Sequence, residues 1–386
     1  MNTSSLPPHR QRTVRGFVVL TMLLLVGSIT VVLLAQRPIL TTPSVRHTPP
    51  PQETATPLRL SLLTHLSALT MLSPTEGWAI GNGGTTGTDH QALLLRYHDG
   101  AWQALPLSAS GNELHALAMV STTEGWVGGT RQVGDPSQGV LLHYIQGQLS
   151  TVALPSGVGD VTGIAMISPT EGWAVTTTSS PQGYPQILHY TQGQWQIALT
   201  VAGNAAFTSI AMVSPIEGWA TGVGAGTSNL WHYTQGKWQH VLLADPQGAD
   251  LEYLSMLSAD EGWGIGTYSV SSSKSDQVPH TAGALWHYRQ GAWQVVARYT
   301  DDHGQTVHVA AIQAVNADDV WVSEMDSTGR RFLHVTAGGW QTVDAPIRDG
   351  ITSISFLSAQ EGWAVGDAGQ ILHFRQGQWT DYPTSG

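Results

Sequence analysis

Histidines and carboxylates recur at fixed positions along this 386-residue chain. Six histidines occupy the same place in a repeated apolar run, and a carboxylate recurs ahead of each. The first set is His143, His189, His232, His287, His334 and His373, with Arg96 at the equivalent place in the first copy. The second set is Glu76, Glu124, Glu171, Glu217, Glu261, Asp319 and Glu361. Imidazoles and carboxylates are both metal ligands, so each set raises the question of a cation site.

The carboxylates belong to a longer repeat. The tripeptide Glu-Gly-Trp occurs six times, and a seventh copy reads Asp319-Val320-Trp321. The copies recur at intervals of roughly 42 to 58 residues, which indicates one supersecondary unit repeated seven times. A motif present in every copy is expected to build the unit. Function is therefore sought where the copies differ.

Each copy contains four short runs rich in β-branched and aromatic residues, here named A to D. In the third copy they cover 161–168, 172–176, 186–190 and 194–199. The A–B connection reads Ser-Pro-Thr-Glu-Gly in copies one and three, where we expect glycine to supply a positive φ. The C–D connection is mostly Gln-Gly. Two short hairpin turns in each copy predict a four-stranded antiparallel meander.

Seven such sheets predict an all-β fold, a seven-bladed β-propeller. A solenoid would need capping repeats of different composition, whereas the first and last copies are as complete as the others. The segment 58–63 could add a strand that latches the ends of the ring. The propeller is predicted to span 58–386, with blades at approximately 66–107, 114–154, 161–199, 207–243, 251–298, 307–344 and 351–382.

Thirteen of the 15 tryptophans occupy two positions in the repeat. Because a buried tryptophan removes a large apolar area from water, we expect these side chains to wedge blade against blade. A sugar-stacking surface is the alternative. Strand B begins with Trp78, Trp126, Trp173, Trp219, Trp263, Trp321 and Trp363, and strand D begins with Trp102, Trp195, Trp238, Trp293, Trp340 and Trp379.

The topology argues against a shared metal site. Strand C is third from the axis and strands lie about 4.8 Å apart, so histidines of different blades cannot converge on one ion. We expect each histidine to bond a neighbouring turn or blade. The carboxylates lie in the A–B turns, and we interpret them as caps that accept backbone N–H bonds. A ring of carboxylates around a cation remains the alternative; we predict no metal and no cofactor.

The repeat I-x-S/A-I-x-M/F-x-S-x-x-E-G-W-A-V-G, followed by I-L-H-Y-x-Q-G-Q-W, resembles that of the photosystem II stability and assembly factor family. The resemblance covers residues 66–382 and implies a seven-bladed propeller. The C–D hairpin is similar to the Asp-box of sialidase-like and sortilin-like propellers, but its aspartate survives only at Asp99. The family's functional arginine-rich patch has no counterpart among the few, scattered arginines. The resemblance therefore implies the fold, and neither a photosynthetic nor a sialidase role.

The N-terminal segment has the features of a membrane anchor. Residues 16–35 carry no charge, and a helix of that length spans roughly 30 Å. Basic residues precede it, which predicts a cytoplasmic tail at 1–15 and an extracytoplasmic propeller. A cleaved signal peptide, giving a secreted protein, is the alternative. Residues 36–57 form a Pro/Thr-rich linker, typical of a semi-rigid spacer.

Composition excludes several classes of function. The net charge is −11, so a phosphate backbone would be repelled and nucleic-acid binding is not expected. The absence of cysteine excludes disulfides and thiol nucleophiles. The Gly-x-Ser-x-Gly, His-Glu-x-x-His and Gly-x-x-x-x-Gly-Lys signatures do not occur. We predict no catalytic residue; the alternative is an extracellular hydrolase on a sialidase-like propeller.

The connections between strands divide into two groups. The A–B and C–D turns hardly change in length, and they define the constant face of the disc. The B–C and D–A connections vary, and they emerge together on the opposite, variable face. Variation on one face of a repeat protein commonly marks the binding face. The candidate binding residues are Asp89, His90, Arg131, Asp135, Tyr184, Tyr268, Lys274, His280, Asp301, Asp302, His303, Arg330 and Arg331.

Together these observations predict a membrane-anchored propeller outside the cytoplasm. Its expected role is to bind or assemble a protein or glycan partner without catalysis. A purely structural surface protein is a further alternative.

Overall fold

The computed structural model describes residues 58–83, 91–107, 111–131, 138–178, 184–202, 205–224, 229–270, 280–300, 306–326 and 329–383. The predicted tail, membrane segment and linker at 1–57 lie outside the described residues. Within these ranges, no helix combines the length and the apolar character needed to cross a membrane.

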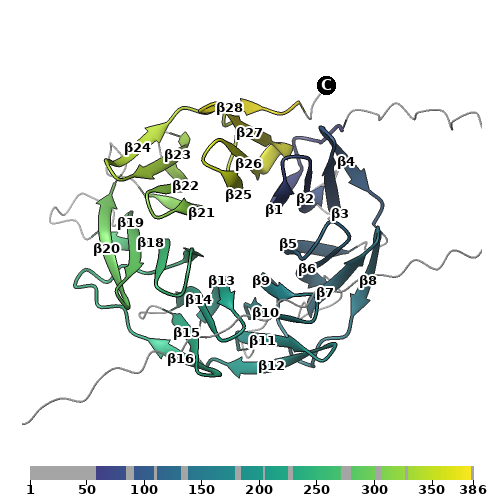
Figure 1. The fold of residues 1–386 in the computed structure, drawn as a ribbon, viewed down its shortest axis with the longest axis horizontal. Helices are drawn as coiled ribbons and strands as arrows, with labels where there is room; N and C mark the ends of the chain where they lie inside the picture. Colours follow the sequence, from purple (N-terminus) through teal and green to yellow (C-terminus); the bar gives the residue numbers. More distant parts are fainter. Residues whose placement is uncertain are drawn as a thin grey trace, which may run out of the picture. The chain divides into compact units, whose positions relative to one another are not determined.

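Seven four-stranded antiparallel sheets surround a central axis, and each sheet is built from four consecutive strands (Figure 1). This confirms the predicted seven-bladed propeller. The innermost, A strands are β1 (His65–Ser73), β5 (Asn112–Met119), β9 (Val161–Ser168), β13 (Ala205–Ser214), β17 (Tyr253–Met256), β21 (His308–Asn316) and β25 (Ile351–Ser358). The B strands are β2 (Glu76–Gly83), β6 (Glu124–Arg131), β10 (Glu171–Thr176), β14 (Glu217–Gly224), β18 (Glu261–Val270), β22 (Asp319–Asp326) and β26 (Glu361–Gly366).

The outer half of each blade consists of strands C and D, and Figure 1 shows the D strands at the periphery. The C strands are β3 (Gln91–His98), β7 (Gln138–Ile145), β11 (Gln186–Thr191), β15 (Leu230–Thr234), β19 (His280–Arg289), β23 (Gly329–Thr336) and β27 (Ile371–Arg375). The D strands are β4 (Ala101–Leu105), β8 (Gln148–Val152), β12 (Gln194–Thr200), β16 (Lys237–Val241), β20 (Ala292–Tyr299), β24 (Gly339–Val343) and β28 (Gln378–Asp381). A short 3₁₀ turn, η1 (Asp367–Gly369), joins β26 to β27.

The C–D hairpins have the conformation that the Gln-Gly pairs predict. Gln192 and Gly193 have φ of 51° and 78°, and Thr191 pairs with Gln194 across the turn. Two consecutive positive φ values are those of a type I′ turn, whose twist matches that of a β-hairpin. The same pair of positive φ values recurs in five other blades; in blade 6, Gly339 has a φ of 111°.

The glycine of Glu-Gly-Trp has a different role from the expected one. We predicted a positive φ, but Gly172 lies inside β10, paired with Met166 of β9, and is not in the left-handed region. A Cβ at this position would collide with the sulfur of Met166. Blade 6 has the reverse arrangement, because Val320 replaces the glycine and its partner is the smaller Ala314. The glycine therefore makes room for a large side chain on strand A.

Tryptophans form the core between adjacent blades. Trp173 of β10 is buried and packs edge to face on Trp238 of the next blade, with ring centroids 5.4 Å apart. The pairs Trp126–Trp195, Trp219–Trp293, Trp321–Trp379 and Trp363–Trp102 repeat this contact. Trp340 departs from it: its side chain is 45% exposed and contacts Tyr299.

The ring closes without a shared strand. Residues 58–63 form no strand, so the predicted latch strand is wrong. Leu58 and Leu60 instead pack against the core between blades 1 and 7. The hydroxyl of Tyr382 also lies 3.3 Å from the carbonyl of Gly100 in blade 1. Packing and side-chain bonds fasten the two ends, because each sheet already has its four strands.

Candidate functional site

The constant face carries the same three-residue contact in six blades. In blade 3, Nε2 of His189 donates to the carboxylate of Glu171 over 3.0 Å. The imidazole stacks on Trp173, with centroids 3.9 Å apart and planes 10° apart. Histidine, carboxylate and tryptophan therefore form one unit that joins strand C to the start of strand B. The other pairs are His143–Glu124, His232–Glu217, His287–Glu261, His334–Asp319 and His373–Glu361.

Blade 1 replaces this histidine with an arginine. Nε of Arg96 donates to Glu76 over 2.6 Å, and the guanidinium lies 5.4 Å from the ring centroid of Trp78. In every blade the carboxylate is thus bonded within its own sheet. Among the described residues, no group of three or more histidine or acidic side chains could hold a metal ion.

Bonding to cations stabilises the charged form of two of these carboxylates. Burial alone would raise the pKa of Glu76, but the bonds from Arg96 and His98 outweigh it and hold the pKa below its ordinary value. The pKa of Glu361 is lowered in the same way, since the bonds from Arg375 and His373 outweigh burial. Glu76 and Glu361 are therefore stable as anions.

The A–B turns have caps other than the predicted glutamates. The hydroxyl of Ser168 accepts the backbone N–H of Thr170 over 3.2 Å. A serine has this role in six blades, and Asn316 has it in blade 6. The glutamates bond to strand C instead, because each begins strand B and lies beside the third strand.

A cavity of about 450 Å³ lies on the propeller axis. Its lining residues come from the A strands of all seven blades and lie mostly in the first half of each strand. Strand A runs from the D–A connection to the A–B turn, so this cavity belongs to the variable-face half of the channel. The polar and aromatic lining residues are His65, Ser67, His115, Asp160, Thr162, Phe207, Thr208, Ser209, Tyr253, Thr352 and Ser353.

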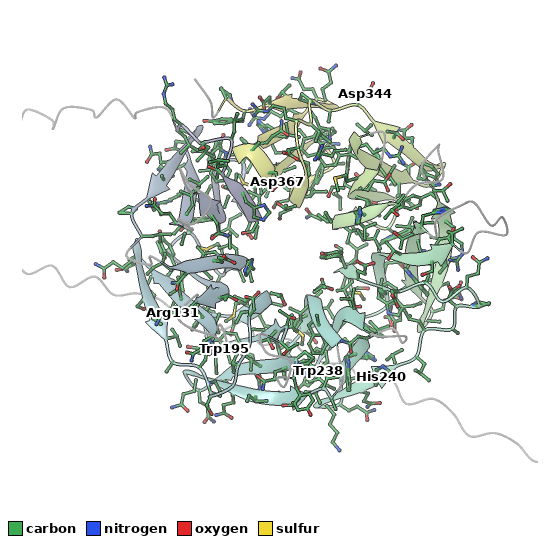
Figure 2. The ribbon with its side chains drawn as sticks, turned by 180° about the vertical axis from the view of Figure 1, so that it is seen from behind. Arg131, Trp195, Trp238, His240, Asp344 and Asp367 are labelled. Atoms are coloured by element: carbon green, nitrogen blue, oxygen red, sulfur yellow. The ribbon has the colours of Figure 1, made fainter. Side chains whose placement is uncertain are left out.

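Two histidine–aspartate pairs lie at the cavity. Nδ1 of His65 is 2.5 Å from Oδ1 of Asp367, and both side chains are partly exposed. Figure 2 shows Asp367 beside the central opening, whereas Asp344 lies on the outer rim. The second pair is looser, with Nε2 of His115 3.5 Å from Oδ2 of Asp160. These side chains place titratable groups from blades 1, 2, 3 and 7 around one space.

The pKa of Asp160 is raised, in contrast to those of Glu76 and Glu361 on the constant face. Burial is the main cause, and the His115 and Thr130 side chains offset it only in part. Burial also raises the pKa of Asp250 and of Glu252, which lie just before β17. The variable-face half of the molecule therefore holds carboxyl groups whose charge is poorly stabilised, a feature that functional sites often share.

The predicted binding residues are dispersed over the variable face. Seven of them lie outside the described residues: Asp89, His90, Asp135, Lys274, Asp301, Asp302 and His303. The other six are Arg131, Tyr184, Tyr268, His280, Arg330 and Arg331, and none of these lines the axial cavity.

Four of the six described residues are engaged within the propeller. Arg330 and Arg331 pair with Asp349 and Glu324, over 2.6 and 2.5 Å. The ring of Tyr268 lies 4.6 Å from the guanidinium of Arg298, and Arg131 lies 3.4 Å from Asn112. Tyr184 is 50% exposed. The hairpin of β18 and β19 extends to the pair Val270–His280, so Tyr268 and His280 lie in strands and not in a connecting loop.

The cavity residues escaped sequence reasoning because they lie in strand A or, in the case of Asp160, directly before it. We assigned that strand to blade building and looked for function in the loops. A signal was available, since His65, His115 and Asp160 are titratable residues in the first half of strand A or directly before it. A search for titratable side chains near the start of this innermost strand would have found them.

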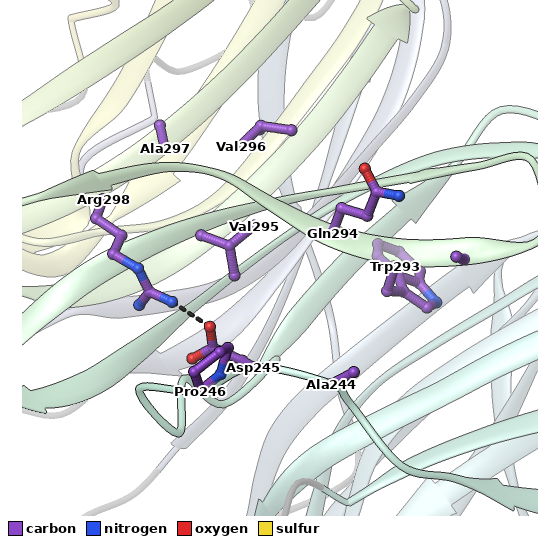
Figure 3. Close-up of a pocket in the computed structure, with 10 residues that line it drawn as sticks. Ala244, Asp245, Pro246, Trp293, Gln294, Val295, Val296, Ala297 and Arg298 are labelled. Atoms are coloured by element: carbon purple, nitrogen blue, oxygen red, sulfur yellow. Dashed lines mark hydrogen bonds and ion pairs between the residues drawn. The ribbon is translucent and has the colours of Figure 1, made fainter.

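A second hollow, of about 680 Å³, lies between the D–A connection of blade 4 and the edge strand β20 (Figure 3). Trp293, Val295 and Val296 contribute to its wall. Arg298 is paired with Asp245, as the dashed line in Figure 3 shows. The charge in this groove is therefore balanced by its own partner, unlike that of the axial cavity.

Comparison with known proteins identifies the fold. No protein-family model matches the chain, and no curated protein matches it in sequence. Among solved structures, YCF48 bound to a D1 peptide is 17% identical with a TM-score of 0.56, over 83% of this chain and 96% of that one. YCF48 from Cyanidioschyzon merolae is 14% identical with a TM-score of 0.54, over 83% and 98% of the two chains. The predicted resemblance to this assembly factor is thus supported by the structure.

Enzymes share the same architecture. The GH74 xyloglucanase from Xanthomonas campestris is 12% identical with a TM-score of 0.62, over 84% of this chain and 55% of that one. Identities this low show a common fold and leave activity open. The chain is thus similar in fold to YCF48, with a seven-bladed propeller that binding proteins and hydrolases both use.

Proposed function

We propose that this protein is a membrane-anchored, extracytoplasmic propeller that binds or helps assemble a protein partner through its variable face, without catalysis. One observation carries the proposal. The constant face is occupied by bonds within each blade, whereas the variable-face half holds an axial cavity with poorly stabilised charge. A side chain of a partner could complete the bonding there, because the contact of Asp160 with His115 is 3.5 Å long.

Two further features support binding over hydrolysis. Glycoside hydrolysis commonly needs two carboxyl groups on either side of the substrate. Of the two described carboxylates at the cavity, Asp367 is paired closely with His65, which leaves Asp160 as the one that is loosely paired. In addition, the solved structure of YCF48 contains a D1 peptide, so a propeller of this shape does accommodate a peptide. The uncharged segment 16–35 supports the membrane anchor and the outward orientation.

The test is capture of a partner by the full-length chain. The native protein and a variant with 271–279 replaced by a short Gly-Ser turn are each crosslinked on intact cells. A matched variant carries Gln192→Asn in a C–D turn of the constant face. We expect the variable-face change to reduce capture and the constant-face change to leave it intact. A partner that is captured equally by variants of every variable connection would contradict the proposal, and capture of a glycan alone would redirect it.

A further inference from the structure

The carboxylate of Asp160 is poorly compensated within the propeller. Its contact with His115 is 3.5 Å long, which exceeds the 2.7–3.2 Å of an ordinary N–H···O hydrogen bond. Its Oδ1 is buried and has no partner at hydrogen-bond distance within the described part of the chain; the nearby hydroxyl of Thr130, which offsets the effect of burial in part, is itself without a hydrogen bond. A buried carboxylate is costly unless it is paired and hydrogen-bonded. Asp160 thus lacks a close hydrogen-bond donor, and it lies on the wall of the cavity.

Several other polar groups of the wall are already engaged. The hydroxyls of Ser67 and Thr162 donate to backbone carbonyls of the next blade, over 2.6 and 2.8 Å, and Thr352 donates likewise across the closure of the ring. His65 pairs with Asp367. No arginine or lysine is among the described lining residues. The described wall therefore holds one carboxylate and no permanent cation, and the hydroxyls of Ser67, Thr162 and Thr352 are committed to the fold.

The cavity also has a size and an apolar lining suited to a long side chain. Its volume of about 450 Å³ lies within the range of pockets that bind small ligands. Leu254, Ile312 and Ile354 line it together with Tyr253. Long basic side chains bury their aliphatic stems against such surfaces, and aromatic rings attract their charged ends.

We propose that the axial cavity receives an arginine or lysine side chain from an extended segment of a partner protein, with its charged end paired to Asp160. The inference rests on the proposed binding function and names the chemistry of its ligand. A protein source fits the position, because the cavity lies on the axis and all seven blades contribute to its wall. A segment seated there also meets the surrounding variable connections.

The experiment uses the full-length chain in detergent and a fluorescein-labelled Gly-Gly-Arg-Gly-Gly peptide. Its twin contains citrulline, which has nearly the shape of arginine and no charge. We expect anisotropy titrations to show binding of the arginine peptide, at least tenfold weaker binding of the citrulline twin, and a loss of about 10- to 100-fold with Asp160→Asn, the range for a charged hydrogen bond. Asp344→Asn makes the same charge change on the rim and should leave affinity unchanged.

Several outcomes would overturn the inference. They are equal binding of the two peptides, an unchanged affinity in Asp160→Asn with its melting temperature intact, or binding of free agmatine as tight as that of the peptide. The last result would assign the cavity to a small amine instead of a protein. The proposed function is tested separately. If partner capture depends on residues 271–279 but is unchanged by Asp160→Asn, only the cavity assignment is refuted.

Discussion

The two faces of the propeller hold carboxylates whose pKa values are shifted in opposite directions. On the constant face, Glu76 and Glu361 accept bonds from arginine and histidine, and their pKa values are lowered. In the variable-face half, burial dominates and raises the pKa of Asp160, Asp250 and Glu252. The first arrangement contributes to stability, whereas the second reduces it. Groups that cost stability are expected where a protein binds something, since function and stability compete at such sites.

The largest expected effect is a loss of unfolding free energy when a buried tryptophan between two blades is removed. It tests whether the tryptophan contacts in the constant-face half stabilise the propeller. Trp173→Ala should lower the free energy of unfolding by about 4 kcal/mol, because it leaves a cavity between blades. Trp340→Ala is the matched control in blade 6, where the side chain is half-exposed, and should cost under about 1 kcal/mol. Urea denaturation measures both. Similar losses in the two variants would mean that the exposed tryptophan packs as the buried ones do.

The second prediction concerns the glycine of the repeat. Gly172→Val should cost about 1–3 kcal/mol, because its side chain would collide with Met166. Adding Met166→Ala reproduces the Ala314–Val320 pair of blade 6 and should recover most of that loss. Thermal and urea unfolding of the two single variants and the double variant give the coupling free energy. Additive losses in the double variant would rule out this size exchange.

The third prediction is the pH dependence of the constant face. Glu76→Gln should reduce stability at pH 7 by about 1.5–3 kcal/mol, the cost for hydrogen bonds to charged groups. The folded pKa of Glu76 is below its ordinary value, so its contribution is complete above that ordinary value and is lost as pH falls through the folded pKa. The difference between native protein and variant should therefore shrink in acid. A difference that stays constant down to the acid limit would show that charge is not its source.

The smallest expected effect is a gain in stability, whereas the preceding variants lose stability. It concerns a residue of the variable-face half. Asp160→Asn should stabilise the protein at pH 7 by about 1 kcal/mol, since it removes a poorly paired, partly buried charge. The folded pKa of Asp160 is raised, so native stability falls as pH rises from the ordinary pKa through the folded one. The gain should thus appear with rising pH and vanish in acid. Calorimetric melting across this pH range checks it, with Asp344→Asn as control, and destabilisation at pH 7 would reverse the comparison.

Sequence reasoning reached the architecture because each blade is built from local signals. The Gln-Gly turns and the spacing of Glu-Gly-Trp are visible in the chain and are satisfied within a single blade. It was less accurate about individual roles. The glycine's size constraint depends on Met166 in the preceding strand, and the glutamate's partner is a histidine in the following strand. The spacing of residues along the sequence does not give the distance or the relative orientation of two side chains on neighbouring strands.

The sequence by itself determined seven blades, their strand order and the division into a constant and a variable face. These follow from hairpin turns and apolar runs, which act over a few residues. Only the tertiary structure decided which side chains meet at the axis. His65, His115 and Asp160 are far apart in the chain and come from three blades, and closure of the ring brings them around one cavity. Burial in that closed ring, and not residue type, separates Asp160 from the bonded carboxylates of the other face.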